Sequence, residues 1–199
     1  ELSHKGYQTI AIGTVGERSL LSALAVTAGI TGYPMAELLA ENNCTLSIQE
    51  KAKQLTASLA EHDLPSQDGV HVLATVGSPD VVVLTGLILG AASHRMAVVF
   101  DTAETGAAVL AAKCINEAVM DYVFSSVHPG EPVQAAQMKY LGIKPHLFYG
   151  FEMDEALGST MGLSVLDAGM HMLNDMKTFG EASVNVAVDG PGSKRQDGR

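Results

Sequence analysis

The sequence predicts an α/β fold in which a parallel sheet is covered by helices on both faces. Short apolar runs alternate with segments of helical periodicity, the pattern expected when each crossover between parallel strands contains a helix. With 199 residues, 47% of them hydrophobic, the chain is long enough to bury one sizeable core. We therefore expect one Rossmann-like domain over residues 1–188 and a disordered tail, rich in glycine and charge, over residues 189–199.

The first half of the chain begins with a strand that turns directly into a helix. The residues from Thr9 to Ile12 are apolar enough for a short buried strand. Gly13 and Gly16 then permit a tight turn into the next helix. The expected elements in order are a strand at 9–12, a helix at 19–27, a polar loop around Asn42 and Asn43, a helix through Lys51 and Leu59, and a linker at 63–69.

The second half opens with a clear helix start and the most apolar helix of the chain. Ser78 suits an N-cap position, and Pro79 suits the first helical turn. The helix from Asp80 to Ser93 is apolar almost all round, so we expect it to be buried, with Gly86 and Gly90 allowing close packing. The remaining expected elements are a strand at 96–100, a helix at 106–114, a strand at 122–124, a helix at 131–140 ended by Gly142, and an amphipathic helix at 158–176.

Composition excludes several classes of function. The formal net charge is −10, whereas sequence-independent binding of DNA or RNA requires a positive surface. The longest apolar stretch, Val81 to Ala92, is interrupted by glycine and is too short to cross a bilayer, so we expect no membrane partner. Cys44 and Cys114 form no spaced motif, and the seven histidines lack metal-ligand spacing. We expect a cytoplasmic protein without a disulfide framework, a metal or a cofactor.

Three segments of the sequence are placed to line a ligand site. In open parallel sheets, ligands bind at the carboxyl ends of the strands, beside the loops that lead into helices. The loop after Ile12, the strand end at Asp101 and the segment around Glu155 meet this description. We therefore expect them to approach one another in the folded chain.

Motifs from Asp68 onwards resemble those of a known enzyme family. The stretches 68–73, 76–77 and 86–92 are similar to its glycine-bearing helix pair, and the strand at 98–101 is similar to the strand that leads into its Asp-Gly-Phe loop. Further positions that keep the family's spacing are Tyr122 to Ser126, Glu131, Leu141, Gly142 and Pro145. On these residues the chain resembles the C-terminal part of the nicotinate-nucleotide:dimethylbenzimidazole phosphoribosyltransferase family, which activates the lower base of cobamides.

The same register places the family's functional segments on this chain. Glu155 falls on the catalytic glutamate, in a segment usually written Arg-Leu-Gly-Glu-Gly-Thr/Ser-Gly that reads Glu-Met-Asp-Glu-Ala-Leu-Gly at 152–158 here. The loop from Gly13 resembles the family's phosphate loop, and Lys51 has the spacing of a lysine that meets the nucleotide phosphate. Family members carry a further N-terminal portion, with much of the aromatic-base pocket, that we expect to be absent from this chain.

The resemblance implies transfer of phosphoribose from nicotinate mononucleotide to an aromatic lower base, dimethylbenzimidazole or a phenol. The product is the α-ribotide used to assemble the nucleotide loop of cobalamin and other cobamides. Glu155 is implied as the general base, a role typically worth about 10²–10⁴-fold in rate. The implied substrate-binding residues are Gly13, Gly16, Ser19, Lys51, Gly77, Asp101 and Gly158.

Each of these residues also has a structural interpretation. An acid such as Glu155 before a helix start complements the helix dipole. The spacing of Gly13 and Gly16 is common in tight turns. Lys51 suits an exposed helical lysine, and Asp101 suits a loop cap. The sequence leaves both interpretations open at each position.

Departures from the family pattern support a second hypothesis. Leu20 and Leu21 replace threonines of the phosphate loop and cannot donate a side-chain hydrogen bond, and Glu152 and Asp154 add charge that disfavours phosphate. The alternative function is a non-catalytic partner that completes an active homologous chain, as in two-subunit members of the family. We expect a homodimer or such a heterodimer, with the methionine-rich helix covered. Its methionines, expected in core or subunit contacts, are Met161, Met170, Met172 and Met176.

Overall fold

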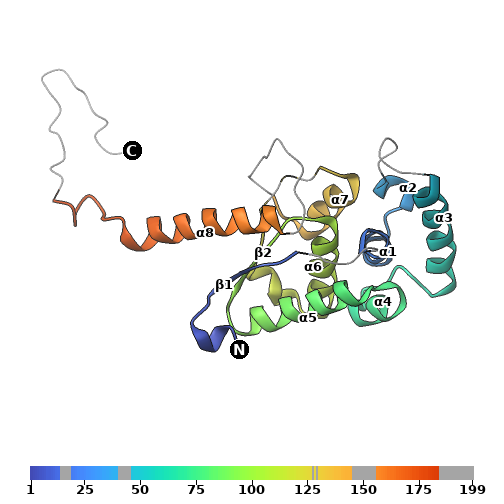
Figure 1. Ribbon diagram of the computed structural model, residues 1–199, viewed down its shortest axis with the longest axis horizontal. Helices are drawn as coiled ribbons and strands as arrows, with labels where there is room; N and C mark the ends of the chain where they lie inside the picture. The colour runs from blue at the N-terminus through green and yellow to red at the C-terminus, as the bar shows by residue number, and fades with distance from the viewer. Residues whose placement is uncertain (14–18, 40–45, 127, 129, 145–155, 184–199) are drawn as a thin grey trace, which may run out of the picture. The chain divides into compact units, whose positions relative to one another are not determined.

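The computed structural model describes residues 1–13, 19–39, 46–126, 128, 130–144 and 156–183 (Figure 1). The chain divides into two compact units, residues 1–165 and 166–199. The first unit contains a parallel sheet surrounded by helices, so the predicted α/β class is confirmed. The tail predicted for residues 189–199 and the polar loop at Asn42 and Asn43 lie outside the described residues.

The sheet has three strands in the order β1-β2-β3, all parallel. They are β1 (Thr9–Ala11), β2 (Ala97–Phe100) and β3 (Val123–Ser125), close to the predicted positions. Val98 in the central strand lies opposite Ile10 on one side and Val123 on the other. Because all three strands run in the same direction, their carboxyl ends meet at one edge of the sheet.

The helices predicted from periodicity are present, with shifted ends. The helix predicted at 106–114 begins earlier, because Thr102 and Thr105 form a reciprocal capping box at its start. Gly142 ends α7 as predicted, with a φ of 73°. The α-helices are α1 (Ser19–Thr31), α2 (Met35–Leu38), α3 (Leu46–Glu61), α4 (Gly69–Val76), α5 (Pro79–Ser93), α6 (Ala103–Ile115), α7 (Pro132–Leu141) and α8 (Leu157–Asp175), and the short 3-10 turns are η1 (Ser3–Lys5) and η2 (Glu117–Asp121).

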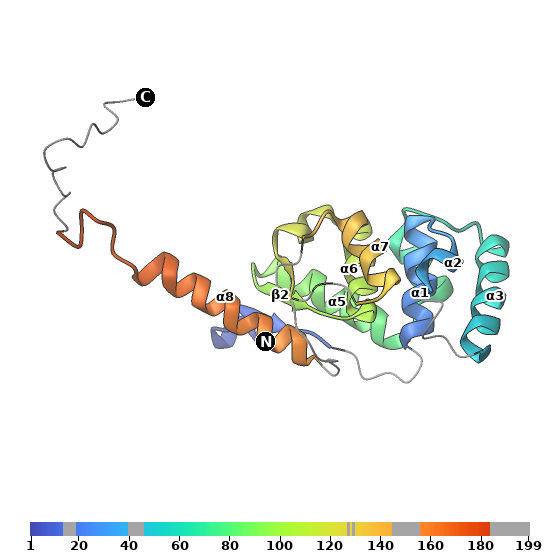
Figure 2. The same cartoon turned by 90° about the horizontal axis from the view of Figure 1, so that it is seen from above.

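Helix α6 lies at the centre of the helical core. It packs against α1, α4, α5 and α7, and its residues from Thr105 to Ala112 are all buried. Figure 2 shows these helices grouped around α6. On β2, Val98 and Phe100 face this core, whereas Val99 approaches Gly162 of α8. Helices therefore cover both faces of the sheet, as predicted.

Gly106 is required where α6 meets α7. A Cβ at this position would lie 2.2 Å from Oε1 of Gln137, a fully buried side chain whose amide donates to Thr27 and to the carbonyl of Ala103. We expect Gly106→Ala to lower the free energy of unfolding by about 1–3 kcal/mol through overpacking. Urea denaturation measures this, with Gly169→Ala as the control because a methyl group there meets no atom within 4 Å. Equal stability of the two variants would contradict the close contact.

Two predictions about burial were wrong in part. Helix α5 was expected to be buried all round, but one side remains exposed, including Val83 at 68%. Met170 and Met172 in α8, and Met176 directly after it, are all exposed. A role of these methionines in subunit contacts stays a prediction.

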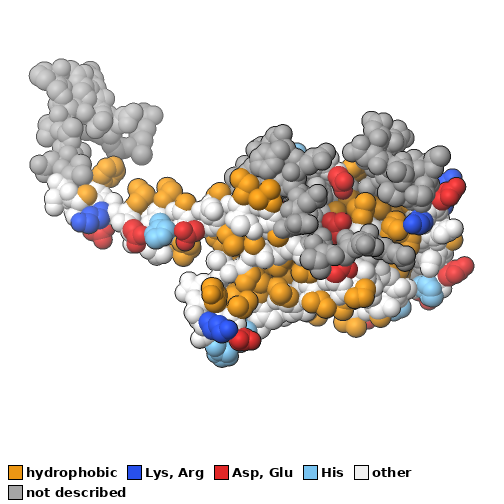
Figure 3. Space-filling view, viewed as in Figure 1, with side chains coloured by type: hydrophobic (Ala, Val, Ile, Leu, Met, Phe, Trp, Pro, Cys, Tyr) orange, Lys and Arg blue, Asp and Glu red, His pale blue; other side chains and the backbone are white. Residues whose placement is uncertain are grey.

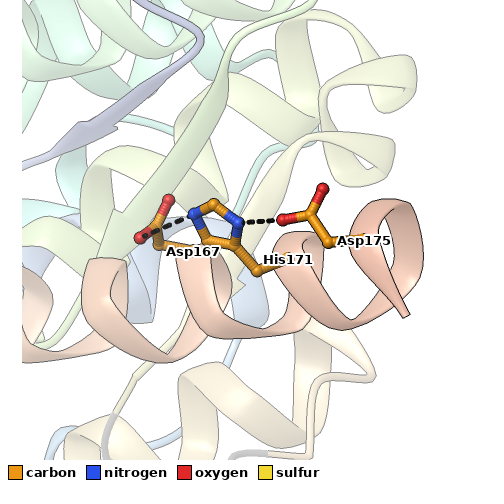
Figure 4. A network of polar contacts seen from close by, with 3 residues as sticks. All are labelled: Asp167, His171 and Asp175. Atoms are coloured by element: carbon orange, nitrogen blue, oxygen red, sulfur yellow. Dashed lines mark hydrogen bonds and ion pairs between the residues drawn. The ribbon is translucent and has the colours of Figure 1, made fainter. Parts of the chain in front are cut away.

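His171 on the polar side of α8 contacts two aspartates of the same helix. His171 lies between Asp167 and Asp175, one turn away on each side (Figure 4). Its Nδ1 lies 2.5 Å from Asp175, and its Nε2 lies 3.9 Å from Asp167. All three side chains are exposed, and i,i+4 pairs of this kind stabilise a helix by roughly 0.2–0.5 kcal/mol when charged. The arrangement supports the helix and does not form an enclosed reactive site.

Candidate active site

The carboxyl ends of the three strands are joined by the first turn of α8. The backbone N–H of Ser159 donates to Oδ2 of Asp101, after β2, at 2.9 Å. The Ser159 hydroxyl donates to the carbonyl of Ile12, after β1, at 2.8 Å. Ser159 is fully buried. One helix start is thereby fixed to the ends of two neighbouring strands.

The third strand contacts the same helix through Gly162. A Cβ on Gly162 would lie 2.5 Å from the Cβ of Ser126 and 2.8 Å from a methyl group of Val99. Ser126 is buried, and its N–H donates to the carbonyl of Phe100 at 3.0 Å, which continues the pairing of β2 and β3. Glycine therefore lets α8 approach the sheet at the edge where ligands bind in such folds.

Gly13 lies directly against the residue that precedes α8. A Cβ on Gly13 would be 2.4 Å from the Cβ of Ala156 and 2.8 Å from its backbone nitrogen. Ala156 has a φ of 67°, the left-handed region that glycine adopts with less strain. Because Ala156 follows Glu155 in the sequence, this contact joins the predicted phosphate loop and the predicted catalytic segment in space.

Asp101 is the buried acid of this junction. Its side chain is 8% exposed, and burial raises the pKa of its carboxyl group. Hydrogen bonds from backbone N–H groups, foremost those of Ser159 and Gly158, oppose that rise. Oδ2 accepts from Ser159, whereas Oδ1 is buried without a hydrogen-bond partner in the described part of the chain. Asp101 therefore caps α8 through Oδ2, and Oδ1 is left without a hydrogen-bond partner among the described residues.

The Asp101→Asn variant separates the capping hydrogen bond at the start of α8 from the charge of the Asp101 carboxyl group. A raised pKa means that the folded protein holds this proton more tightly, so its stability falls as pH rises from the ordinary carboxyl pKa of 3.8 through the raised value. Asp101→Asn keeps an oxygen that can accept from Ser159 but does not titrate. We expect the free energy of unfolding of Asp101→Asn, minus that of the wild type, to increase with pH across this window and then to level off. Denaturant titrations at a series of pH values measure the difference, and a decrease would contradict the assigned cause.

A pair of carboxylates, Glu104 and Glu131, lies at the starts of α6 and α7. The pKa of Glu131, at the N-cap position of α7, is raised by burial of its carboxyl group and by the negative charge of Glu104. Gln134 connects this region to β2, because its Nε2 donates to the carbonyl of Asp101 at 3.0 Å while its Oε1 accepts from the N–H of Gly130. An acid with a raised pKa beside a ligand edge is a candidate for proton transfer.

Other predicted site residues lie on the helices behind this edge. The hydroxyl of Ser22, in α1, donates to the carbonyl of Val76 and accepts from the N–H of Ser78, which holds the loop at Gly77 against α1. Lys51 lies on the exposed side of α3, and no ion pair of its ammonium is found among the described residues. The structure thus connects Gly77 with the helix that follows the phosphate loop, and the role of Lys51 stays a prediction.

The remaining predicted site residues divide between the junction and the undescribed segments. Glu155 and Gly16 lie outside the described residues, and Ser19 is described only as the first residue of α1. Gly13, Asp101 and Gly158 come together at the junction, as the sequence analysis expected of their segments. Their direct contact with substrate stays a proposal.

Sequence reasoning missed the residues that assemble the site. Ser159 bonds to residues 58 and 147 positions away in the chain, and Gln134 bonds to a carbonyl 33 positions away. The single local signal was a small polar residue in the first turn of a predicted helix, which is also common where no such bond forms.

The described residues hold no group of three or more histidine, cysteine, aspartate or glutamate side chains suited to a metal ion. In the same part of the chain, no helix combines the length and apolar character needed to cross a membrane. The edge formed by Gly13, Asp101 and Ser159 is held together by hydroxyl, carboxylate and backbone groups.

Comparison with known proteins assigns the chain to a family. A family model described as "Phosphoribosyltransferase" matches residues 1–184. The nicotinate-nucleotide–dimethylbenzimidazole phosphoribosyltransferase of Chloroflexus aggregans is 33% identical over 187 residues, and that of Roseiflexus sp. strain RS-1 is 32% identical over 186 residues. These matches cover 93% and 92% of this chain.

Solved structures agree with the sequence matches. The crystal structure of the enzyme of the same name from Thermus thermophilus superimposes with a TM-score of 0.82 at 25% identity, over 93% of this chain and 55% of that chain. The chain spans 53% of the length of each of the two relatives above. The match of fold, spacing and family model over nearly all of its residues shows that the chain belongs to this phosphoribosyltransferase family.

Proposed function

We propose that this chain transfers phosphoribose from nicotinate mononucleotide to an aromatic lower base, giving the α-ribotide for cobamide assembly. The relatives from Chloroflexus and Roseiflexus are named for dimethylbenzimidazole, which supports this class of acceptor. In the reaction, a ring nitrogen or phenolic oxygen of the acceptor forms a bond to C1′ of the ribose. The C1′–N bond to nicotinate breaks, its electron pair returns to the pyridine ring, and the acceptor loses its proton.

The contact between Gly13 and Ala156 is the observation that carries this proposal. It brings the loop expected to hold phosphate next to the residue after Glu155, and Asp101 and Ser159 fix that arrangement to the sheet. Phosphate and nucleophile must be held within one nucleotide's reach for displacement at C1′. The contact brings two segments 143 positions apart in the chain together at the edge where open α/β sheets bind ligands, which supports this placement.

The proposed roles follow from this placement. Glu155 accepts the proton of the lower base. The backbone N–H groups around Gly13, Gly16 and Ser19, at the start of the 13-residue helix α1, bind the phosphate together with Lys51. Asp101 offers its unpaired Oδ1 to a ribose hydroxyl, and Gly77 and Gly158 let the backbone approach the nucleotide closely.

The alternative of a non-catalytic partner subunit is not favoured. Where the family pattern has glycine after the glutamate, this chain has Ala156, yet the backbone there adopts the left-handed conformation natural to glycine, with a φ of 67°. The substitution has therefore not removed the turn that leads from Glu155 into α8. Retention of this geometry, at a cost of about 1–2 kcal/mol for alanine, fits a site that is still in use.

Turnover tests the proposal directly. The whole protein is incubated with nicotinate mononucleotide and either dimethylbenzimidazole or a phenol, and chromatography follows nicotinate and the ribotide. We expect equal amounts of both products with at least one acceptor and no ribotide without an acceptor. Release of neither product with any acceptor would contradict the proposed activity.

Lys51→Ala tests the phosphate role. Loss of one charge-assisted contact to phosphate is expected to weaken nucleotide binding by about 1.5–3 kcal/mol, seen as a higher KM for nicotinate mononucleotide. Lys53→Ala, on the same exposed helix two positions away, is the matched control and should leave KM unchanged. Equal effects of the two variants would remove Lys51 from the site.

Assembly and cellular setting complete the proposed function. The protein acts as a dimer in the cytoplasm, where its two cysteines stay reduced. The exposed apolar residues of α5 support association.

A further inference from the structure

The hydroxyl group of Ser22 joins three helices at one point. Ser22 lies in α1, three residues after its start, and is buried, with 8% of its surface exposed. Its Oγ donates to the carbonyl of Val76, the last residue of α4, at 3.0 Å. The same Oγ accepts from the backbone N–H of Ser78, the N-cap residue of α5, at 2.7 Å. One side chain of α1 is thereby bonded to the residues on both sides of Gly77, 54 and 56 positions further along the chain.

Both hydrogen bonds satisfy backbone groups at helix ends. The last carbonyls of α4 and the first N–H groups of α5 have no partner within their own helices. The side chain of Ser78 does not cap α5, and its hydroxyl group bonds to the carboxylate of Asp80 instead. A hydroxyl group donates and accepts at the same time, whereas an alanine at position 22 would do neither. The connection between α1 and this loop therefore depends on the hydroxyl group of Ser22.

Gly77 is fixed on its other side by α4. Its N–H donates to the carbonyl of Leu73 at 2.9 Å, and an added Cβ would lie 2.5 Å from that oxygen. Ser22, in turn, follows Ser19 by three residues, which is about 4.5 Å along the helix axis. Because α1 is continuous over this turn, Ser22 moves together with the N–H groups at the helix start. The bonds of Ser22 therefore set the distance from the start of α1 to Gly77.

The three helices that meet at Ser22 have no lysine or arginine. None occurs in α1, α4 or α5, and Figure 3 shows hydrophobic side chains along α5. These helices can therefore hold an anionic ligand through backbone N–H and hydroxyl groups, but not through a basic side chain. A lysine reaches a ligand on a flexible stem, whereas a backbone N–H points where its helix places it. Binding at the start of α1 thus depends on how the helices are fixed to one another.

We infer that Ser22 is a positioning residue of the nucleotide site, whose hydroxyl group holds the start of α1 and Gly77 at the distance that nicotinate mononucleotide spans. The inference rests on the proposed function, which assigns the phosphate to the start of α1 and a close approach of the nucleotide to Gly77. A ligand that contacts two segments binds well when they are already held in place, because otherwise part of the binding free energy is lost in ordering them. Ser22 acts through these segments and does not itself touch the substrate.

The Ser22→Ala variant of the whole protein tests this role. We expect both the KM and the calorimetric Kd for nicotinate mononucleotide to rise at least about tenfold, with kcat at saturating nucleotide within about threefold of the wild type. Binding lost equally from the ground state and the transition state raises KM alone. Ser22→Thr keeps the hydroxyl group and should have a KM well below that of Ser22→Ala. The matched control is Thr85→Val in α5, which removes a buried hydroxyl group bonded to the carbonyl of Val81 at 2.8 Å and should leave KM unchanged.

Inorganic phosphate separates an effect on distance from damage to the phosphate site. As a competitive inhibitor it contacts the start of α1 without reaching Gly77, so its inhibition constant should change less than about twofold in Ser22→Ala. An inhibition constant that rises as much as KM, or a KM in Ser22→Ala equal to that of an active wild type, would overturn the inference and leave the proposed function intact. A wild type that neither binds nor turns over nicotinate mononucleotide would overturn both.

Discussion

Replacement of Glu155 by glutamine is expected to lower kcat for ribotide formation by about 10²–10⁴-fold, the usual contribution of a general base. Glutamine keeps the size and hydrogen-bonding shape of the side chain but cannot take a proton from the lower base. Binding of nicotinate mononucleotide should change little, because the proposed role concerns the acceptor. Steady-state kinetics with saturating nucleotide and varied acceptor measure the loss.

Two controls make this result specific to Glu155. Glu131→Gln removes the second carboxyl group with a raised pKa at the strand ends, and the pair of variants shows which acid takes the proton. If Glu155→Gln also lowers thermal stability, Glu155 stabilises the start of α8. Full activity of Glu155→Gln together with loss of activity in Glu131→Gln would transfer the proposed role to Glu131.

Gly13→Ala is expected to lower both the stability and the activity of the protein. The new Cβ would lie 2.4 Å from the Cβ and 2.8 Å from the backbone nitrogen of Ala156, so the start of α8 must move. We expect a loss of about 1–3 kcal/mol in the free energy of unfolding, as for other overpacked sites. A displacement of about 1 Å near the reacting groups costs about 10²-fold in rate, so kcat should fall by at least that factor.

A second substitution tests the cause of this loss. Ala156→Gly removes one of the two colliding Cβ atoms and suits the φ of 67° at this position. We expect the Gly13→Ala/Ala156→Gly double variant to recover part of both stability and rate. A double-mutant cycle with no coupling between the two positions would show that they do not meet in the active protein.

The strands and helices were predictable because their signals are local. The residues Ala97–Phe100 are all apolar, so side chains on both faces of the sheet can be buried, as expected of a central parallel strand. Gly142 ends α7 in the left-handed backbone conformation that glycine favours. The start of α6 was misplaced by three residues, because its capping box has Thr105 at the third helical position, where glutamate or glutamine is the usual signal.

The site was predictable in outline but not in its internal contacts. The segments at Gly13, Asp101 and Glu155 were expected at one edge because parallel strands share a direction. The bonds that Ser159 makes to Asp101 and Ile12 depend on how a helix docks on the sheet, which no local pattern encodes. The burial of α5 was overestimated for a related reason: an apolar sequence shows that a face needs covering, but not whether the same chain covers it.

Calorimetric binding of nicotinate mononucleotide to the wild type, Gly13→Ala and Glu155→Gln tests the central claim most directly. The claim is that the junction of Gly13 with the start of α8 forms the nucleotide site. It predicts binding by the wild type, binding of similar strength by Glu155→Gln, and binding at least tenfold weaker by Gly13→Ala. No binding by the wild type at millimolar nucleotide, or unchanged binding by Gly13→Ala, would contradict it.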